Sequence, residues 1–416
     1  MVHGEIWTLK EFFVYPNEYI YWSIQIVMYP FMTGLVAGAF VLSSLYHVFG
    51  FKELKDIARF SLVFSFALLP CAPLPLLLHL QQPLRNHHVL MTPHFTSAIA
   101  AFGIVFMTYG MIVAAELWFV YRKHFVEQAA ALGSSGSGFD RLRGKFFSLL
   151  TLGASDISEE ALHADEKAVK FLAASGIPVA CFLHGYAGFI FGSVKANALW
   201  MTPLMPVIFI CSAVVSGIAL CILSFIAVSK LRIFINKLKL KHEIGTPSSY
   251  RLQEAELAVV TKTSRYLLIF LVLAITLELL DLIFRGYTAV KSWDILRSVI
   301  YEKDFIKIFV LQYGLGNLVP FVLLLLPGLT LRRIIVGTSM VLLGVFMMRW
   351  NVVIGGQAFS ASFAGFMEYR LPVIPHDLET FREGLFGALF VVSMPYILFT
   401  MLNGIMPVYS RKEERS

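Results

Sequence analysis

Titratable and strongly hydrogen-bonding side chains lie inside segments of this chain that are otherwise apolar. Four of them could accept or pass a proton, because imidazole and carboxyl groups change charge in ordinary pH ranges. These four are His79, His184, Glu278 and Asp281. Four others could hold the oxygen atoms of a small ligand through hydrogen bonds. These are Gln25, Tyr29, Tyr186 and Arg349.

The acidic pair is the most unusual feature of this set. A charged group inside a membrane costs on the order of 2.5–3.5 kcal/mol on insertion scales, so such groups face the protein interior and find partners. Glu278, Asp281 and Arg285 are spaced three and four residues apart, so they share one helix face and Asp281 can pair with Arg285. The sequence leaves two interpretations open: a proton-accepting or ligand-lining site, and an ion network, extended to Arg349, that only fixes helix packing.

Nine long apolar segments carry these residues. Hydrophobic residues make up 57% of the chain, charged residues 15%, and the mean hydropathy is +0.73, a composition that excludes an ordinary soluble domain. Each segment approaches or exceeds the roughly 20 residues that a membrane-spanning helix needs, and β-barrel alternation is absent. The sequence therefore predicts an all-α polytopic membrane protein with nine spans, or ten if part of 357–383 enters the membrane. The nine segments are 20–49, 57–81, 94–121, 168–192, 204–228, 264–287, 305–327, 331–356 and 384–408.

The distribution of Lys and Arg predicts the orientation. With the N-terminus outside and the C-terminus cytoplasmic, 23 of the 34 Lys and Arg residues lie inside and 11 outside, as the positive-inside rule requires. The excess of Lys and Arg then faces anionic lipid on the cytoplasmic side, so it does not indicate nucleic-acid binding. In this orientation the candidate residues lie in the outer halves of their helices. The inner half holds little beyond His47 and Glu116, which argues against a transmembrane proton pump.

No metal site is predicted. The four cysteines show no paired spacing, and the chain has neither a phosphate-binding glycine loop nor a His-Glu-x-x-His motif. A b-type cytochrome, which needs two layers of paired histidines, is one alternative; His79, His94 and His184 share one layer, without a second pair farther in. A secondary transporter, with broken helices around a midplane site, is another. Several prolines could break helices, but the polar layer is off-centre.

Several ordered segments resemble the NrfD/polysulfide-reductase family of membrane anchors. The segment from His79 to Arg85 closes the second predicted helix, and Thr92 to Ser97 opens the third with a polar, Ser-containing start. Gly34 and Gly38 form a small-residue pair on the first helix that allows close helix approach. Residues 184–217 and 349–357 complete a resemblance that covers nearly the whole chain. Among the branches, the chain is most similar to the DsrP-type anchors of sulfur-metabolising respiratory complexes.

The resemblance implies two transmembrane four-helix bundles with an added helix. The first would cover residues 1–200, with a cytoplasmic loop at 122–167, and the second 201–356. Residues 357–416 would form an outer connection, the last span and a cytoplasmic tail.

The resemblance also implies a function. The chain would exchange electrons between a quinone, menaquinone or ubiquinone, and a ferredoxin-like iron–sulfur subunit on the non-cytoplasmic side of the inner membrane. A multihaem cytochrome c and further membrane or cytoplasmic subunits would complete the complex. The chain itself would hold no haem or iron–sulfur cluster.

The chain departs from the family at positions that would bind the quinone. Family members carry His and Asn on the first helix, where this sequence has Gln25 and Tyr29, and an acidic residue ends their second helix, where it has His79. We expect His79 or His184 to accept the proton, Tyr186 and Gln25 to bind a carbonyl, and Glu278 or Asp281 to pass the proton outward. His184 and Tyr186 project about 200° apart on one helix, so only one can face the ligand, and the resemblance favours Tyr186.

Overall fold

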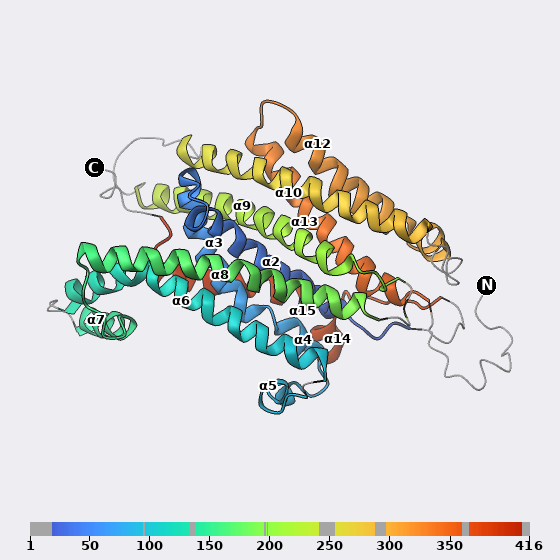
Figure 1. Cartoon of the computed structure of the whole chain (residues 1–416), viewed down its shortest axis with the longest axis horizontal. Coiled ribbons are helices and arrows are strands. Elements are labelled where there is room, and N and C mark those ends of the chain that lie inside the picture. The colour runs from blue at the N-terminus through green and yellow to red at the C-terminus, as the bar shows by residue number, and fades with distance from the viewer. Residues whose placement is uncertain are drawn as a thin grey trace.

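The chain folds almost entirely into helices that run along one long axis (Figure 1). The computed structural model describes residues 19–94, 96–133, 138–194, 197, 199–240, 254–287, 297–359 and 366–409. Within these residues nine helices are long and apolar enough to cross a membrane, which confirms the predicted all-α polytopic class. They are Ile24–His47, Lys52–His79, Ala100–Gly133, Glu159–Gly192, Met205–Ile235, Glu256–Arg285, Ile306–Leu325, Leu331–Gln357 and Leu385–Ile405.

Several spans combine more than one helical element. The second span consists of the 3-10 turn η1 (Lys52–Leu54), α3 (Lys55–Leu68) and α4 (Leu74–His79), and a short 3-10 turn at Pro70 joins α3 to α4. The seventh consists of η5 (Ile306–Leu318), wound as a π-helix, and α12 (Val319–Leu325). The other spans belong to single helices: α2 (Ile24–His47), α6 (Ala98–Gly133), α8 (Glu159–Gly192), α9 (Met205–Leu240), α10 (Glu254–Tyr287), α13 (Leu331–Val353) and α15 (Leu385–Ile405).

The segment 122–167, expected to be a solvated connector, is largely helical. Helix α6 continues to Gly133, α7 (Gly138–Leu150) follows, and α8 already begins at Glu159. Ser158 caps α8 by accepting a hydrogen bond from the Ala161 N–H. The extended ends of α6 and α8 are tied together by Arg122, whose Nη2 lies 2.7 Å from Asp165 Oδ2. Residues 134–137, in the glycine- and serine-rich stretch between α6 and α7, lie outside the described residues.

Helix α2 lies at the centre of the molecule and packs most extensively against α9 (Figure 1). The contact depends on two glycines: a Cβ atom added to Gly217 would lie 2.4 Å from the Gly38 backbone, and one added to Gly38 would lie 2.1 Å from the Ala213 carbonyl oxygen. The predicted role of Gly38 in close helix approach is confirmed. A second such crossing joins η5 to α13, where Gly316 faces Gly344.

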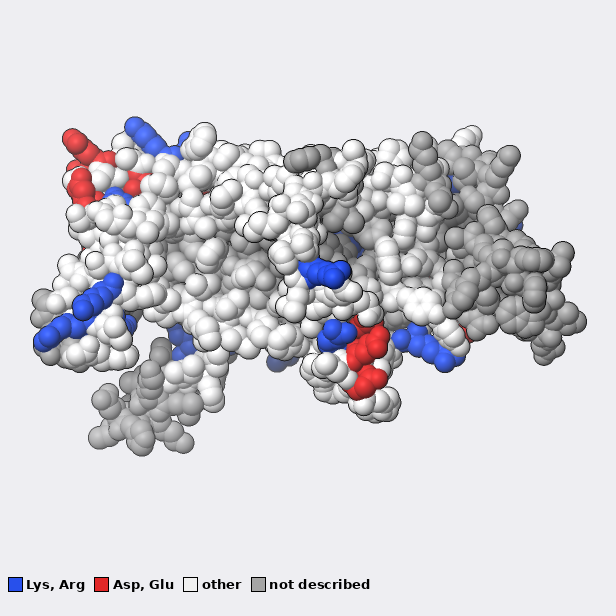
Figure 2. Space-filling view, turned by 90° about the horizontal axis from the view of Figure 1, so that it is seen from below, with Lys and Arg blue, Asp and Glu red and all other residues white. Residues whose placement is uncertain are grey.

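The remaining helices arrange around this central pair. Helices α3 and α8 pack against α2, and α6 packs against α8. Helices α8, α10 and α13 pack against α9, the η5–α12 span packs against α13 and α10, and α15 packs against α3. The division of the chain into two bundles at residues 200 and 201 stays a prediction. In the described part of 357–383 the only helix is the short α14 (Leu378–Glu383), so those residues form no tenth span. Figure 2 shows large areas of surface without charged side chains, as a membrane-facing protein requires.

Candidate functional site

A cluster of polar side chains, here called the His79 cluster, forms where α4 ends beside the starts of α2 and α15. It consists of Ser23, Gln25, His79, Tyr369 and Glu383. The Nδ1 atom of His79 lies 3.1 Å from Ser23 Oγ and 3.4 Å from Glu383 Oε1. The side chains of His79 and Glu383 are 22% and 17% exposed, so the pair can be reached from outside the protein.

Gln25 holds α14 against α2. Its Nε2 donates a hydrogen bond of 2.6 Å to the Arg382 carbonyl oxygen, which fixes the amide orientation, because a carbonyl can only accept. The other amide atom, Oε1, is buried and has no partner among the described residues. Tyr369 also anchors this region, because its hydroxyl accepts a 2.8 Å hydrogen bond from the Ile24 N–H. Burial raises the pKa of Tyr369 to about 12, so the hydroxyl keeps its proton and can also donate.

Glu383 is the titratable acid of the cluster that sequence reasoning missed, along with Ser23 and Tyr369. Burial, with a smaller contribution from the nearby Glu379 carboxylate, raises the pKa of Glu383 above its ordinary value. The carboxyl group therefore keeps its proton to a higher pH than a solvated glutamate does. The signal that could have found it is the pair Arg382 and Glu383 directly before the last apolar span, where a charge at the membrane edge needs a partner.

An aromatic row extends from the first helix toward the protein surface. Tyr29 lies one helical turn after Gln25, and its ring meets Phe102 edge-on at 5.9 Å between centroids. Phe102 in turn stacks on Tyr186 at 6.4 Å, and Tyr186 contacts Phe182, whose side chain is 57% exposed. The predicted ligand residues Tyr29 and Tyr186 therefore belong to one row of contacting rings, which reaches the protein surface at Phe182.

His184 faces a different environment from Tyr186, as their spacing predicts. Its Nε2 lies 2.8 Å from Arg349 Nη2, which also donates a 2.7 Å hydrogen bond to Ser212 Oγ. The guanidinium group of Arg349 stacks on the Phe209 ring at 3.6 Å, and Gly34 leaves the room that the imidazole ring fills. Arg349 and His184 are buried, at 0% and 1% exposure, at the junction of α2, α8, α9 and α13.

The partner of His184 determines which of its nitrogens carries the proton. Because a guanidinium group can only donate, Nε2 must accept and the ring proton lies on Nδ1. That Nδ1 atom is buried without a partner among the described residues, as is Nε of Arg349. The alternative pairing expected for Arg349, a salt bridge to Glu278 or Asp281, is not the contact that the structure shows. The site roles of His184 and Arg349 stay predictions.

Glu278 is the centre of an amide network between α10 and η5. Its Oε2 accepts hydrogen bonds from Gln312 Nε2 at 3.0 Å and from Asn317 Nδ2 at 3.1 Å. Gln312 Oε1 in turn accepts a 2.8 Å bond from Asn351 on α13, whose own Oδ1 is buried without a partner among the described residues. The Tyr313 hydroxyl lies 3.4 Å from the Glu278 backbone oxygen. The Glu278 carboxyl group thus joins α10 to η5, and Gln312 extends the network to α13.

Asp281 forms the ion pair that its spacing predicts. Its Oδ2 accepts from Arg285 Nε at 2.8 Å, and its Oδ1 accepts from the Thr202 hydroxyl at 2.5 Å. Arg285 also donates to the Leu199 carbonyl oxygen at 2.8 Å, which joins the end of α10 to the segment before α9. These satisfied contacts favour a packing role for Asp281, whereas the network at Glu278 reaches a larger open space through Asn317.

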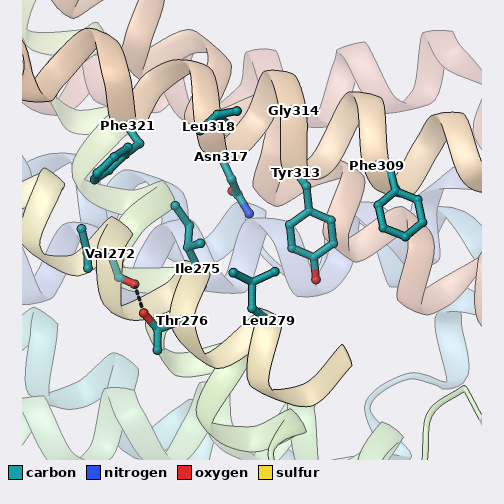
Figure 3. A pocket seen from close by; sticks show the side chains of 10 residues that line it. All are labelled: Val272, Ile275, Thr276, Leu279, Phe309, Tyr313, Gly314, Asn317, Leu318 and Phe321. Atoms are coloured by element: carbon teal, nitrogen blue, oxygen red, sulfur yellow. Dashed lines mark hydrogen bonds between the residues drawn. The ribbon is translucent and has the colours of Figure 1, made fainter. Parts of the chain in front are cut away.

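That space is a cavity of about 470 Å³ between α10 and the η5–α12 span. Figure 3 shows Tyr313 and Asn317 among its mainly apolar lining. A second, smaller cavity of about 110 Å³ lies on the other side of Tyr313 and is lined in part by Glu278, Asp281 and Gln312. No group of three His, Cys, Asp or Glu residues within the described segments could hold a metal ion, and the expected absence of a metal stays a prediction.

Comparisons with known proteins point in one direction. The family model described as Polysulphide reductase, NrfD, matches residues 15–361. A selenate reductase subunit of Mesobacillus selenatarsenatis is 28% identical over 96% of this chain and 88% of its own length. A putative dimethyl sulfoxide reductase membrane subunit of Halobacterium salinarum is 27% identical over 77% of this chain and 65% of its own length.

Proposed function

The chain belongs to the NrfD polysulphide reductase family, and from this premise we propose that it is the quinone-reactive membrane subunit of a respiratory reductase complex. It exchanges electrons between menaquinone or ubiquinone and an iron–sulfur subunit. Both relatives are named as subunits of reductases, and one of them as a membrane subunit, which supports a role beside other catalytic chains. The observation that carries the proposal is the His79 cluster, whose Gln25 lies one helical turn before Tyr29 of the aromatic row.

The residues of the His79 cluster fit the two oxygens of a quinol. Gln25 Oε1 is an acceptor without a partner among the described residues, which suits a hydroxyl donor. His79 is partly exposed and its Nδ1 contacts Ser23 and Glu383, which leaves its Nε2 atom to accept a proton from a ligand. Gln25 is fully buried, so a ligand reaches its oxygen only when a neighbouring side chain turns aside. The rings of Tyr29, Phe102 and Tyr186 would line the approach from lipid.

Proton transfer follows from these positions. His79 accepts the proton of a quinol hydroxyl, and the ionised form of Glu383, with an oxygen 3.4 Å from His79 Nδ1, stabilises the imidazolium ion that results. The quinone supplies the two-electron chemistry when bound. Glu383 thereby provides the carboxyl group that the resemblance leads one to expect at the end of the second helix, from a segment roughly 300 residues later in the chain.

The partners and the orientation are part of the same proposal. The N-terminus faces outside and the C-terminus the cytoplasm, so a ferredoxin-like iron–sulfur subunit docks on the non-cytoplasmic side near α14. A multihaem cytochrome c and further subunits complete the complex, and its terminal substrate is a sulfur compound. Mild detergent extraction followed by identification of the co-purifying chains tests this assembly. Recovery of the chain alone would favour the transporter alternative.

The histidine arrangement gives less support to a b-type cytochrome. Within the described residues His79 and His184 lie in separate clusters, and His94 is exposed and contacts Thr96 at 2.8 Å. Axial haem ligands need two imidazoles that face each other across a haem. The rings of His87 and His88 are 4.3 Å apart, too close for a haem between them.

Replacement of His79 tests the proposed base. We expect His79→Phe to lower quinol turnover of the assembled complex about 100-fold or more, the usual contribution of a general base. His87→Phe is the matched control, because His87 is an exposed histidine in the loop that follows the same span. Equal turnover in both variants, with the complex intact, would place the site elsewhere.

A further inference from the structure

We propose that the cavity between α10 and the η5–α12 span is a second quinone-binding site, separate from the His79 cluster. The inference rests on the proposed function, since it assumes that quinone is the ligand of the protein. It differs in place: the His79 cluster is built from α2, α4 and the segment before α15, whereas this cavity is built from α10, η5 and α12. No residue is shared between the two.

The lining suits a ring that carries an apolar tail. Figure 3 shows Phe309, Tyr313 and Phe321 along one wall and aliphatic side chains from α10, including Ile275 and Leu279, along the other. Aromatic walls favour a flat ring, and a volume of about 470 Å³ lies within the range of small-molecule sites. Both walls belong to membrane spans, and Leu279 and Leu318 are 41% and 59% exposed, so an isoprenoid tail can extend into lipid.

The uncharged lining favours a neutral polar end over a phospholipid headgroup. A phospholipid carries an anionic phosphate, which needs Lys or Arg, and neither residue type lines this cavity. Asn317 lies near the middle of the span Ile306–Leu325, where a charged headgroup would be far from water. An amphiphile whose polar end reaches that depth must be neutral, and a quinone is such a molecule.

The polar end of the cavity provides groups for quinone oxygens. Asn317 donates one N–H to Glu278 Oε2, and its carbonyl oxygen can accept from a ligand hydroxyl. The Tyr313 hydroxyl is only 3.4 Å from the Glu278 backbone oxygen, a long bond that it can exchange for a ligand carbonyl. Glu278 behind them connects through Gln312 to Asn351, so a ligand here would contact the amide network that joins three helices.

A bulky substitution tests the second site. We expect wild-type chain, purified in its complex and saturated with menaquinone, to retain two quinones per chain after washing. Leu279→Trp places a ring in the cavity and should reduce the number to one. Leu280→Trp is the control: Leu280 neighbours Leu279 on α10, is also half-exposed, at 50%, and does not line the cavity. This control should retain two.

The outcomes separate the second site from the proposed function. A photoreactive quinone should label peptides containing Phe309 to Phe321 in wild-type chain and in His79→Phe, but not in Leu279→Trp. One quinone per wild-type chain, unchanged by Leu279→Trp, would overturn the second site and leave the His79 cluster standing. A phospholipid recovered from the cavity by native mass spectrometry would also overturn it. The second site would also be overturned if His79→Phe lost all of its quinone while the other variants lost none.

Discussion

At the scale of single residues, the chemistry of His79 depends on a partner from a distant part of the sequence. Glu383 and the backbone of Arg382 reach the cluster only because the segment before the last span folds back onto the start of α2. His184 shows the opposite case. Its side chain is the same imidazole, but its Nε2 atom is hydrogen-bonded to Arg349, which is fully buried. Two histidines of similar predicted depth thus have different surroundings.

The Tyr186 hydroxyl gives a prediction at this scale. Tyr186→Phe keeps the stacking on Phe102 and removes one hydrogen-bonding group. We expect the rate of quinol turnover to fall roughly 5- to 30-fold. This loss corresponds to about 1–2 kcal/mol of transition-state stabilisation, the contribution of one hydrogen bond. Tyr287→Phe, at an 89% exposed tyrosine at the end of α10, is the control. Turnover and inhibitor binding unchanged by both substitutions would remove Tyr186 from the site.

At the scale of elements, close helix contacts hold the polar clusters in position. Gly34 and Gly38 lie one turn apart on α2; the first makes room for His184 and the second lets α9 approach. The α2–α9 contact therefore sets where the His184 ring stands relative to Ser212 and Arg349. On the other side of the molecule the π-helical winding of η5 presents Gln312, Tyr313 and Asn317 toward α10 together.

The glycine contact between α2 and α9 can be tested by a single methyl group. In Gly217→Ala the new Cβ atom would lie 2.4 Å from the Gly38 backbone, so one helix must move. We expect a loss of about 1–3 kcal/mol of stability, the usual cost of overpacking, seen as a lower midpoint of thermal unfolding in detergent. Gly404→Ala on α15 is the control, because nothing lies within 4 Å of a Cβ there and alanine favours helix. Equal midpoints would contradict the contact.

At the scale of the whole molecule, nine spans put the two ends of the described chain at opposite ends of the bundle (Figure 1). Tyr369 of the His79 cluster bonds to Ile24, near the start of the described chain, whereas Tyr121 on α6 donates to the Pro407 carbonyl oxygen, near its end. The side of the membrane that the His79 cluster faces is therefore the side on which the proposed electron transfer takes place.

Accessibility labelling tests this orientation. A single cysteine at Asn86 should react with a membrane-impermeant reagent added from outside, and one at Ser155 only after the cytoplasmic face is opened. Both side chains are exposed, and they belong to opposite ends of the bundle, so burial cannot explain a difference. The native cysteines all lie in spans, and the parent chain measures their background. The reverse pattern would move the proposed site to the cytoplasmic side.

The sequence by itself determined the helical class, the nine spans and several local contacts, because these depend on properties of neighbouring residues. Hydrophobic length fixes a span, a four-residue spacing fixes the Asp281–Arg285 pair, and a two-residue spacing fixes the opposite directions of His184 and Tyr186. Only the tertiary structure decided which groups meet across helices. Depth along the membrane placed Arg349, His79 and Glu278 in one layer, but depth carries no information on rotation or lateral position. The lateral packing assigned Arg349 to His184, Glu383 to His79 and Asn317 to Glu278.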